Sequence, residues 1–230
     1  MVGPKAIIYH ARPAENLKRQ LDYLAELPKL SLEDALSGKP GVLITIDDGW
    51  AWLLEVWPWF RERGLRPVLF LATILPELRK RGSWDAFVRE RFPRMAKEGL
   101  APLSWDELKG LAKEGLVVQS HTHSHVRVSK ETPLEELELP KRLIGEHLGQ
   151  RVWALAYPYG RAKDVGPGAG EALGRAGYAL GFTARCGFLR GDPLYLPRCY
   201  ADERWPVERL REVLERRFHP LEWLRWRLKI

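Results

Sequence analysis

Apolar runs rich in Val, Ile and Leu alternate along this chain with stretches in which apolar residues return every three or four positions. The runs predict strands buried on both faces, and the stretches predict amphipathic helices that cover them. Strands are expected at 6–10, 42–46, 67–73, 116–119, 152–156 and 178–183, followed by an extended segment at 194–200. Helices are expected at 14–27, 50–63, 104–115, 133–148, 168–176 and 206–217.

The regular alternation of strands and helices predicts an α/β fold whose parallel sheet is covered by helices. With about seven strands, periodicity alone permits either an irregular closed barrel or an open sheet. The chain has 230 residues, of which 45% are hydrophobic, and this is enough for one sizeable core. We therefore interpret residues 1–230 as a single domain.

Local signals refine the expected helices. Ser31, with Asp34 three positions later, is a helix-start signal of the capping-box type, and Ser104 with Glu107 is another. Pro58 lies within the second expected helix, where its missing N–H predicts a kink or a restart.

Two basic segments stand outside this regular order. Residues 76–102 carry several Arg and Lys among aromatic side chains, and we interpret them as a basic amphipathic insertion on the rim of the fold. The insertion is either a lid over a site or a solvated excursion. Residues 219–230 form a basic amphipathic tail that is expected to pack back on the domain, with contact to a membrane surface as the less favoured interpretation.

Charge, apolar runs and cysteine content indicate which partners and which cellular compartment to expect. The net charge of +7 suits anionic substrates, nucleic acid or a lipid surface, but interleaved Arg and Glu along the helices favour solvated faces. We find no secretory leader and no apolar run long enough to span a membrane, so a cytoplasmic location is expected. Cys186 and Cys199 are too few for a disulfide framework and are expected to be two small buried side chains.

Three short strings that follow expected strands carry the candidate chemistry. They are Thr45-Ile-Asp-Asp-Gly49, Ser120-His-Thr-His-Ser-His125 and Tyr157-Pro-Tyr-Gly160. In parallel α/β folds the carboxyl ends of the strands meet at one edge, where ligands bind. Carboxylates and imidazoles gathered at that edge indicate a metal-dependent hydrolase.

The first two strings contain a candidate set of metal ligands. Asp47 and Asp48 leave their strand in different directions, so one carboxylate can bind a cation while the other faces substrate; a simple Asp-Gly turn is the alternative. His121 and His125 are spaced to converge on the same cation, with His123 pointing away. One carboxylate and two imidazoles leave coordination positions open, as in catalytic metal sites. Zinc suits these ligands, and other divalent metals fit as well.

The third string and one neighbouring aromatic residue supply candidate substrate contacts. The stiff turn directs backbone N–H groups toward the rim, and the N–H of Tyr159 is a candidate donor to an oxyanion. Tyr157 and Pro158 of the same turn are expected to contact substrate. Trp50 directly follows the paired aspartates and is expected to stack on a sugar face.

Taken together, the three strings resemble the motifs of the polysaccharide deacetylase family, carbohydrate esterase family four. The family motifs Thr-Phe-Asp-Asp-Gly, His-Ser/Thr-x-x-His and Arg-x-Pro-Tyr/Phe-Gly correspond to 45–49, 121–125 and 158–160, and the resemblance extends over about residues 6–215. It implies a distorted (β/α) barrel that hydrolyses N-acetyl groups on sugars. It also implies that Asp47 is the general base, and that the metal ligands are Asp48, His121 and His125.

Two departures from the family pattern matter. The strand that ends in Leu-x-His is missing near the C-terminus, and Ala6–His10 resembles this strand moved to the front, as in the poly-N-acetylglucosamine deacetylase branch. His10 is then the implied general acid, with His219 as a weaker candidate. Ala156 stands where the family has an Arg that pairs with the catalytic Asp. We expect Arg198, in a Leu-Pro-Arg segment similar to one of that branch, to take this place; a surface Arg is the alternative.

Three hypotheses for the function follow. The leading one is a metal-dependent hydrolase that removes N-acetyl groups from an amino-sugar glycan. A second keeps the chemistry and changes the substrate to a small intracellular amide or imide. A third is a catalytically impaired barrel that binds a glycan or an anionic surface. Nucleic acid is not favoured as a partner.

Overall fold

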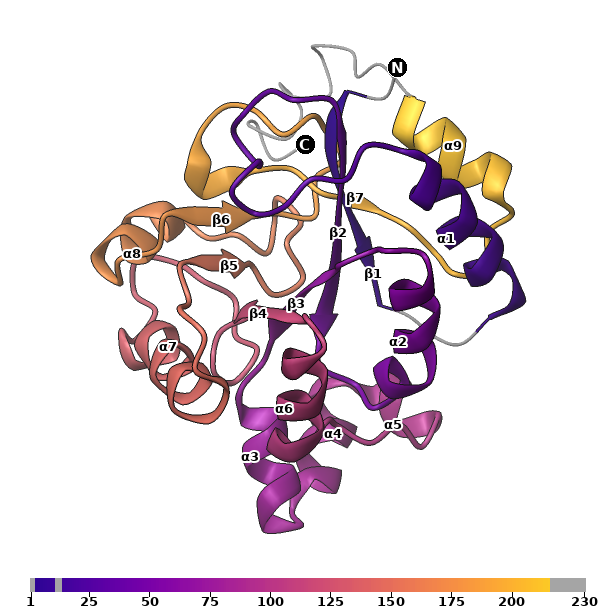
Figure 1. The fold of residues 1–230 in the computed structure, drawn as a ribbon. Coiled ribbons are helices and arrows are strands. Elements are labelled where there is room, and N and C mark those ends of the chain that lie inside the picture. The colour runs from indigo at the N-terminus through magenta and orange to yellow at the C-terminus, as the bar shows by residue number, and fades with distance from the viewer. Residues whose placement is uncertain (1–2, 11–13, 216–230) are drawn as a thin grey trace.

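The computed structural model describes residues 3–10 and 14–215. Its centre is a curled sheet of parallel strands in the spatial order β6-β5-β4-β3-β2-β1-β7 (Figure 1). The strands are β1 (Pro4–Tyr9), β2 (Gly41–Asp48), β3 (Val68–Leu71), β4 (Val117–Ser120), β5 (Ala154–Ala156), β6 (Leu180–Phe182) and β7 (Cys199–Tyr200). The predicted α/β fold, a distorted barrel of parallel strands, is confirmed.

The curled sheet comes close to closing on itself. The first strand, β1, pairs in parallel with β2 on one side and with β7 on the other. At the opposite edge, Phe182 of β6 forms a parallel bridge with Leu196, just before β7. The N-terminal strand therefore lies between β2 and the last strand, and the carboxyl ends of all these strands meet at one rim.

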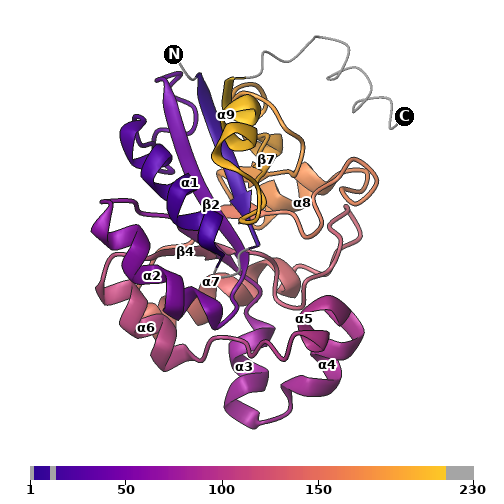
Figure 2. The same ribbon diagram turned by 90° about the vertical axis from the view of Figure 1, so that its right-hand side faces the viewer.

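Helices cover the outside of the sheet (Figures 1 and 2). They are α1 (Glu15–Glu26), α2 (Trp52–Glu62), α3 (Ile74–Arg81), α4 (Trp84–Arg91), α5 (Pro93–Lys97), α6 (Trp105–Lys113), α7 (Glu135–Leu148), α8 (Ala169–Arg175) and α9 (Val207–Glu215), with a short 3-10 helix at Pro193–Tyr195. Helix α1 shows the underlying pattern, because Leu17, Leu21 and Leu24 return at helical spacing and are buried.

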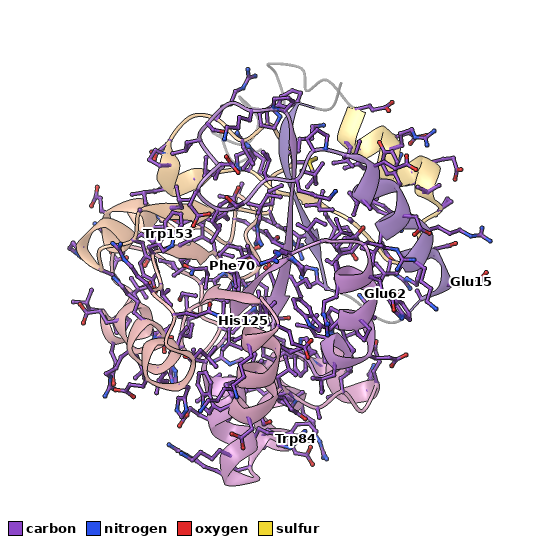
Figure 3. All side chains as sticks on the ribbon, in the orientation of Figure 1. Glu15, Glu62, Phe70, Trp84, His125 and Trp153 are labelled. Carbon is purple, nitrogen blue, oxygen red and sulfur yellow. A yellow bond between two sulfur atoms is a disulfide. The ribbon has the colours of Figure 1, made fainter. Side chains whose placement is uncertain are left out.

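Apolar side chains fill the space on both sides of the sheet (Figure 3). Strand β2 is buried along its whole length, as expected for a strand covered on both faces. Inside the barrel, the rings of Phe70 and Phe182 lie 5.4 Å apart between their centroids and are fully buried. They form an apolar floor beneath the rim.

The structure corrects one local prediction and excludes one of the two outcomes predicted at Pro58. The helix expected from Ser31 is a turn, in which the Ser31 N–H donates to the Asp34 carboxylate at 3.2 Å, and Gly38 in the left-handed region prevents a helix from continuing. Helix α2 runs through Pro58 without a restart. Pro58 and Leu54 lie on the exposed side of that helix, where water can donate to the Leu54 carbonyl in place of the N–H that the proline lacks. The capping box at Ser104 is present as predicted.

The insertion expected at 76–102 consists of the short helices α3, α4 and α5, which project from one end of the barrel (Figure 2). It is not only a solvated excursion, because Val88, Phe92 and Met95 are buried in the main core. The expected tail at 219–230 and the candidate His219 lie outside the described residues. Among the helices that the structure describes, none is long and apolar enough to cross a membrane.

The two cysteines differ from the expectation. Cys186 and Cys199 form a disulfide that links the segment after β6 to β7. Their separation of 13 residues gave no sign of this pairing, because the contact depends on β7 returning past the segment after β6. Cys199 stands between Arg198 and Tyr200, so the disulfide anchors a strand that contributes to the rim.

Candidate active site

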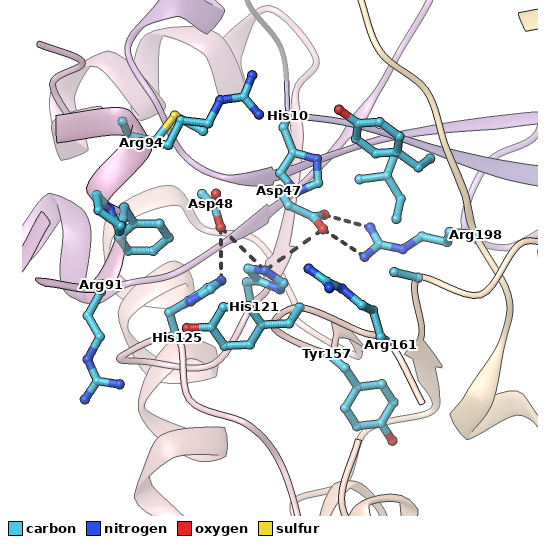
Figure 4. A pocket seen from close by; sticks show the side chains of 17 residues that line it. His10, Asp47, Asp48, Arg91, Arg94, His121, His125, Tyr157, Arg161 and Arg198 are labelled. Carbon is cyan, nitrogen blue, oxygen red and sulfur yellow. Dashed lines mark hydrogen bonds and ion pairs between the residues drawn. The ribbon is translucent and has the colours of Figure 1, made fainter. Parts of the chain in front are cut away.

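A cleft of about 610 Å³ opens at the rim formed by the carboxyl ends of the strands (Figure 4). Side chains at the ends of β1, β2 and β4, together with the segments after β5 and around β7, line one part of it. The α4–α5 insertion supplies the facing wall, from Arg91 to Met95. All three strings singled out in the sequence reach this cleft.

Asp48, His121 and His125 converge in the cleft. One oxygen or nitrogen atom of each lies within 4.8 Å of the others, and all three residues are buried. Asp48 Oδ1 is 3.5 Å from His121 Nε2 and 3.4 Å from His125 Nε2, which is long for a hydrogen bond. Ligand atoms of a tetrahedral zinc ion, with bonds of about 2.0–2.1 Å, lie roughly 3.3–3.4 Å apart. The three residues therefore fit a divalent metal ion.

The His121 ring is held in the orientation that a metal ligand needs. Its Nδ1 lies 2.7 Å from the Ala156 carbonyl oxygen, which can only accept, so Nδ1 carries the hydrogen and Nε2 faces Asp48 with its lone pair. Burial lowers the pKa of His121 to about 4. The imidazole is therefore neutral at pH 7 and available to bind a cation.

The His125 ring is fixed by packing on two sides. Its centroid lies 4.6 Å from that of Phe92 in the insertion and 4.7 Å from that of Tyr159. Within the described part of the chain, its Nδ1 is buried without a hydrogen-bond partner. Packing rather than hydrogen bonding thus directs Nε2 of His125 toward Asp48.

Asp47 points to the other side of the cleft and binds Arg198. The guanidinium donates to both carboxylate oxygens, at 2.7 and 2.9 Å, and also to Thr45 Oγ1 at 2.9 Å. Burial is the largest single effect and favours the neutral acid, but the charge and hydrogen bonds of Arg198, together with His121 and His10, outweigh it and lower the pKa of Asp47 below its ordinary value. Arg198 is fully buried over the Phe70 ring and lies at the position expected of it, beside Asp47.

His10 and Tyr200 lie at the same end of the cleft, on neighbouring strands. Their ring centroids are 5.7 Å apart, and both residues line the cleft. His10 Nδ1 is buried and has no hydrogen-bond partner among the residues that the structure describes. An imidazole without a fixed partner can exchange a proton with a bound ligand.

Backbone strain is concentrated at this rim. Four described residues other than glycine have positive φ: Asp48 at 76°, Thr122 at 62°, His125 at 56° and Tyr159 at 61°. Such conformations cost of order 1–3 kcal/mol each and persist where the surrounding structure enforces them. Gly49, at φ 112°, is in a conformation that strains any other residue, and a side chain there would also press on the Leu71 side chain. The strain falls on all three strings, and this is typical of functional sites.

Tyr157 and Tyr159 of the Tyr157–Gly160 turn line the cleft. No acceptor for the Tyr159 N–H is found within the described chain. The Tyr157 side chain is buried and points away from the two aspartates (Figure 4), contrary to the expected contact with substrate, although the residue lines the cleft. Its hydroxyl donates to the Leu194 carbonyl at 2.9 Å. Pro158 is buried and does not line the cleft, which corrects its expected contact with substrate.

Trp50 also differs from its expected role. Its exposed fraction is 0%, so the ring cannot stack on a sugar face. Phe92 packs against it with ring centroids 5.1 Å apart, and its Nε1 donates to Asp48 Oδ2 at 3.1 Å. Trp50 therefore orients a candidate metal ligand from behind.

Sequence reasoning missed several residues of the cleft. Arg94 and Phe92 come from the insertion, whose position over the site depends on tertiary packing. Arg161 directly follows the Tyr-Pro-Tyr-Gly string and Tyr200 follows Arg198 by two positions, so proximity to the candidate residues was the one available signal.

Comparisons with known proteins agree with this geometry. A family model described as polysaccharide deacetylase matches residues 35–178, more than half of the chain. A search of curated protein sequences gives no significant match. Among solved structures, the deacetylase PplD from Streptococcus pyogenes in complex with acetate superposes with a TM-score of 0.73 at 23% identity, covering 94% of this chain and 99% of that one.

Two further structures share the fold. IcaB from Ammonifex degensii has a TM-score of 0.67 and 24% identity, covering 87% of this chain and 92% of its own. The deacetylase domain of BpsB from Bordetella bronchiseptica has a TM-score of 0.63 and 17% identity, covering 87% and 96%. At these identities the structural likeness establishes the fold, while the family model matches the strings that form the cleft.

Proposed function

The chain belongs to the polysaccharide deacetylase family, and from this we propose that it hydrolyses N-acetyl groups of an amino-sugar glycan with a divalent metal ion, zinc or a similar cation. One observation carries the proposal. Adjacent aspartates are directed to different partners in one cleft, Asp48 toward two imidazoles and Asp47 toward a buried arginine. One carboxylate is thus directed toward the candidate metal ligands, and the other is not and can accept a proton, as metal-assisted amide hydrolysis requires.

The residues divide the chemistry among them. Asp48, His121 and His125 would hold the cation, which when bound polarises the acetyl carbonyl and acidifies water. The Asp47 carboxylate, kept ionised and oriented by Arg198, accepts the proton of the attacking water. The Tyr159 N–H donates to the oxygen that gains negative charge, and His10 donates a proton to the leaving nitrogen.

The structure also bears on the competing hypotheses. An impaired barrel was suggested by Ala156 in place of the family's Arg, but the Arg198 guanidinium supplies the same charge to Asp47 from β7. A catalytically competent site is therefore favoured. A small amide or imide is the alternative substrate, and the experiment below includes it.

The test combines metal analysis with acetate release. The purified protein is expected to contain one divalent metal per chain and to release acetate from N-acetylglucosamine oligomers. A chelator should abolish the activity and added metal should restore it. Acetate release that persists in fully metal-free protein would contradict the proposed metal dependence. Turnover of small amides or imides without turnover of any N-acetylated sugar would contradict the proposed substrate.

A further inference from the structure

The cleft carries an excess of positive charge that the hydrolysis of a neutral sugar does not require. Its lining includes four arginines and two carboxylates among the described residues. Arg198 is engaged by Asp47 through two hydrogen bonds, and a cation bound by Asp48 would cancel the second carboxylate. Three positive side chains then remain at the opening, Arg91, Arg94 and Arg161.

These three arginines have free hydrogen-bonding capacity. Their ion pairs have distances of 3.5 Å from Arg91 to Glu90, 3.4 Å from Arg94 to Glu98 and 3.8 Å from Arg161 to Asp164. Such distances exceed the roughly 2.7–2.9 Å of a charge-assisted hydrogen bond, and a guanidinium has five N–H donors. The side chains are 42%, 56% and 69% exposed, so water covers donors that a ligand can replace.

Arg161 is held at the rim by a buried carboxylate. Asp164 is buried and accepts a hydrogen bond from Arg127 at 2.8 Å, while its second oxygen, 3.8 Å from the Arg161 Nε, has no hydrogen-bond partner in the described chain. Arg127 in turn lies over the Tyr159 ring, 4.6 Å from its centroid. In Figure 4 the Arg161 side chain extends toward the Asp47–Arg198 pair.

Arg94 approaches the cleft from the opposite side (Figure 4). It comes from α5 in the insertion and lies near Tyr200. Burial is the main cause that raises the pKa of the Tyr200 hydroxyl, and the positive charge of Arg94 counters part of this rise. The Tyr200 ring lies beside the His10 ring, tilted by 50° from it. The Arg91 guanidinium, in contrast, points away from the two aspartates. Arg94 and Arg161 thus place positive charge on both sides of the reacting groups.

On the basis of the function proposed above, we propose that the cleft binds an N-acetylated glycan that is anionic, with a phosphate or carboxylate on or next to the reacting sugar. Arg94 and Arg161 bind this negative charge. A neutral polymer gains little from these arginines. Once deacetylated, its ammonium groups are repelled by them. An anionic substituent gains charge-assisted hydrogen bonds and offsets that repulsion.

The experiment compares chitotriose with the same trisaccharide phosphorylated at a 6-hydroxyl, and adds a hyaluronan tetrasaccharide as the carboxylate probe. The preference is the ratio of kcat/KM for an anionic probe to that for chitotriose, measured at low and high salt with metal-loaded protein. Arg94→Gln and Arg161→Gln are each expected to lower the preference about tenfold. Arg161→Lys should restore part of it. Arg89→Gln is the matched control, because Arg89 lies on α4 outside the cleft lining and pairs with Asp85.

Binding separates this inference from the proposed function. Dissociation constants for the same probes, measured by calorimetry in an Asp47→Asn background, are expected to show a preference at least as large, because Arg198 loses its carboxylate partner there, and the same tenfold losses in the Arg94→Gln and Arg161→Gln variants. Binding that prefers the anionic probes, without acetate release from any sugar in the wild-type protein, would overturn the proposed function and leave the inference standing. Equal binding of chitotriose and both anionic probes, or a preference that survives both Gln substitutions, would overturn the inference. A preference confined to the phosphate or to the carboxylate probe identifies the anion.

Discussion

The two sides of the cleft are assembled in different ways. On one side, Asp48, His121 and His125 come from two short strings, and a backbone carbonyl, an indole N–H and aromatic packing orient them. On the other side, the components of the Asp47 site come from opposite ends of the chain: His10 follows β1 and Arg198 precedes β7. The ligands of the first side stand in strings that can be recognised from local sequence, whereas the second side is brought together by β1 pairing with β7.

The comparison predicts that damage to the first side removes metal as well as activity. His125→Ala is expected to lower acetate release about a thousandfold or more, because several kcal/mol of transition-state stabilisation are lost with the cation. Metal content per chain should fall in parallel. The matched control is His123→Ala, since His123 contacts Thr73 and not the candidate ligands, and it should retain metal. Full metal occupancy in His125→Ala would show that the ligand set is wrong.

Damage to the second side should affect stability and pH dependence. Arg198→Ala leaves the buried Asp47 without its partner and is expected to destabilise the protein by about 3–5 kcal/mol in urea unfolding. Asp47 must be ionised to act as a base, so activity is lost as the pH falls through its pKa. Removing the Arg198 charge raises that pKa, so the acid limb of the rate profile should move to higher pH.

A control for this variant is Arg61→Ala. Arg61 forms a surface ion pair with Glu114, and its loss should cost roughly 1 kcal/mol or less. An acid limb that stays in place in an active Arg198→Ala or Arg198→Lys protein would show that Arg198 does not set the pKa of Asp47.

The disulfide belongs to the second side alone. Replacing Cys186 and Cys199 together by Ala should lower the free energy of unfolding by about 3 kcal/mol, as for other loops of similar length, and leave metal content unchanged. Disulfides are typical of proteins in oxidising compartments, and intracellular proteins of hyperthermophiles are an exception. The cytoplasmic location therefore stays a prediction. Thiol titration of the native protein checks the bond, and two free thiols in the folded protein would rule it out.

The smallest expected effect concerns the residue behind the first side. Trp50→Phe keeps the buried ring but removes the N–H that binds Asp48, and it should weaken metal affinity about tenfold. Competition with a chromophoric chelator measures this. Trp57→Phe, whose N–H binds Glu114 away from the cleft, is the control. Equal metal affinity in both variants would mean that Trp50 has no orienting role.

The same contrast explains what the sequence could and could not predict. Hydrophobic periodicity identified the strands, because most of their residues are buried, and the strings at their ends identified both aspartates and the two convergent histidines. The proximity of Arg198 to Asp47 was suggested by resemblance and not by any local pattern. The burial of Trp50 beneath Phe92 and the pairing of Cys186 with Cys199 depend on tertiary contacts between segments, which periodicity does not encode.

The most direct test of this division is metal stoichiometry and acetate release measured together on Asp47→Asn. The substitution keeps the shape of the side chain and removes its ability to accept a proton. We predict about one metal ion per chain, as in the wild-type protein, with acetate release reduced by a factor on the order of 10³. Loss of the metal, or acetate release at the wild-type rate, would contradict the separation of the two aspartates into a metal ligand and a base.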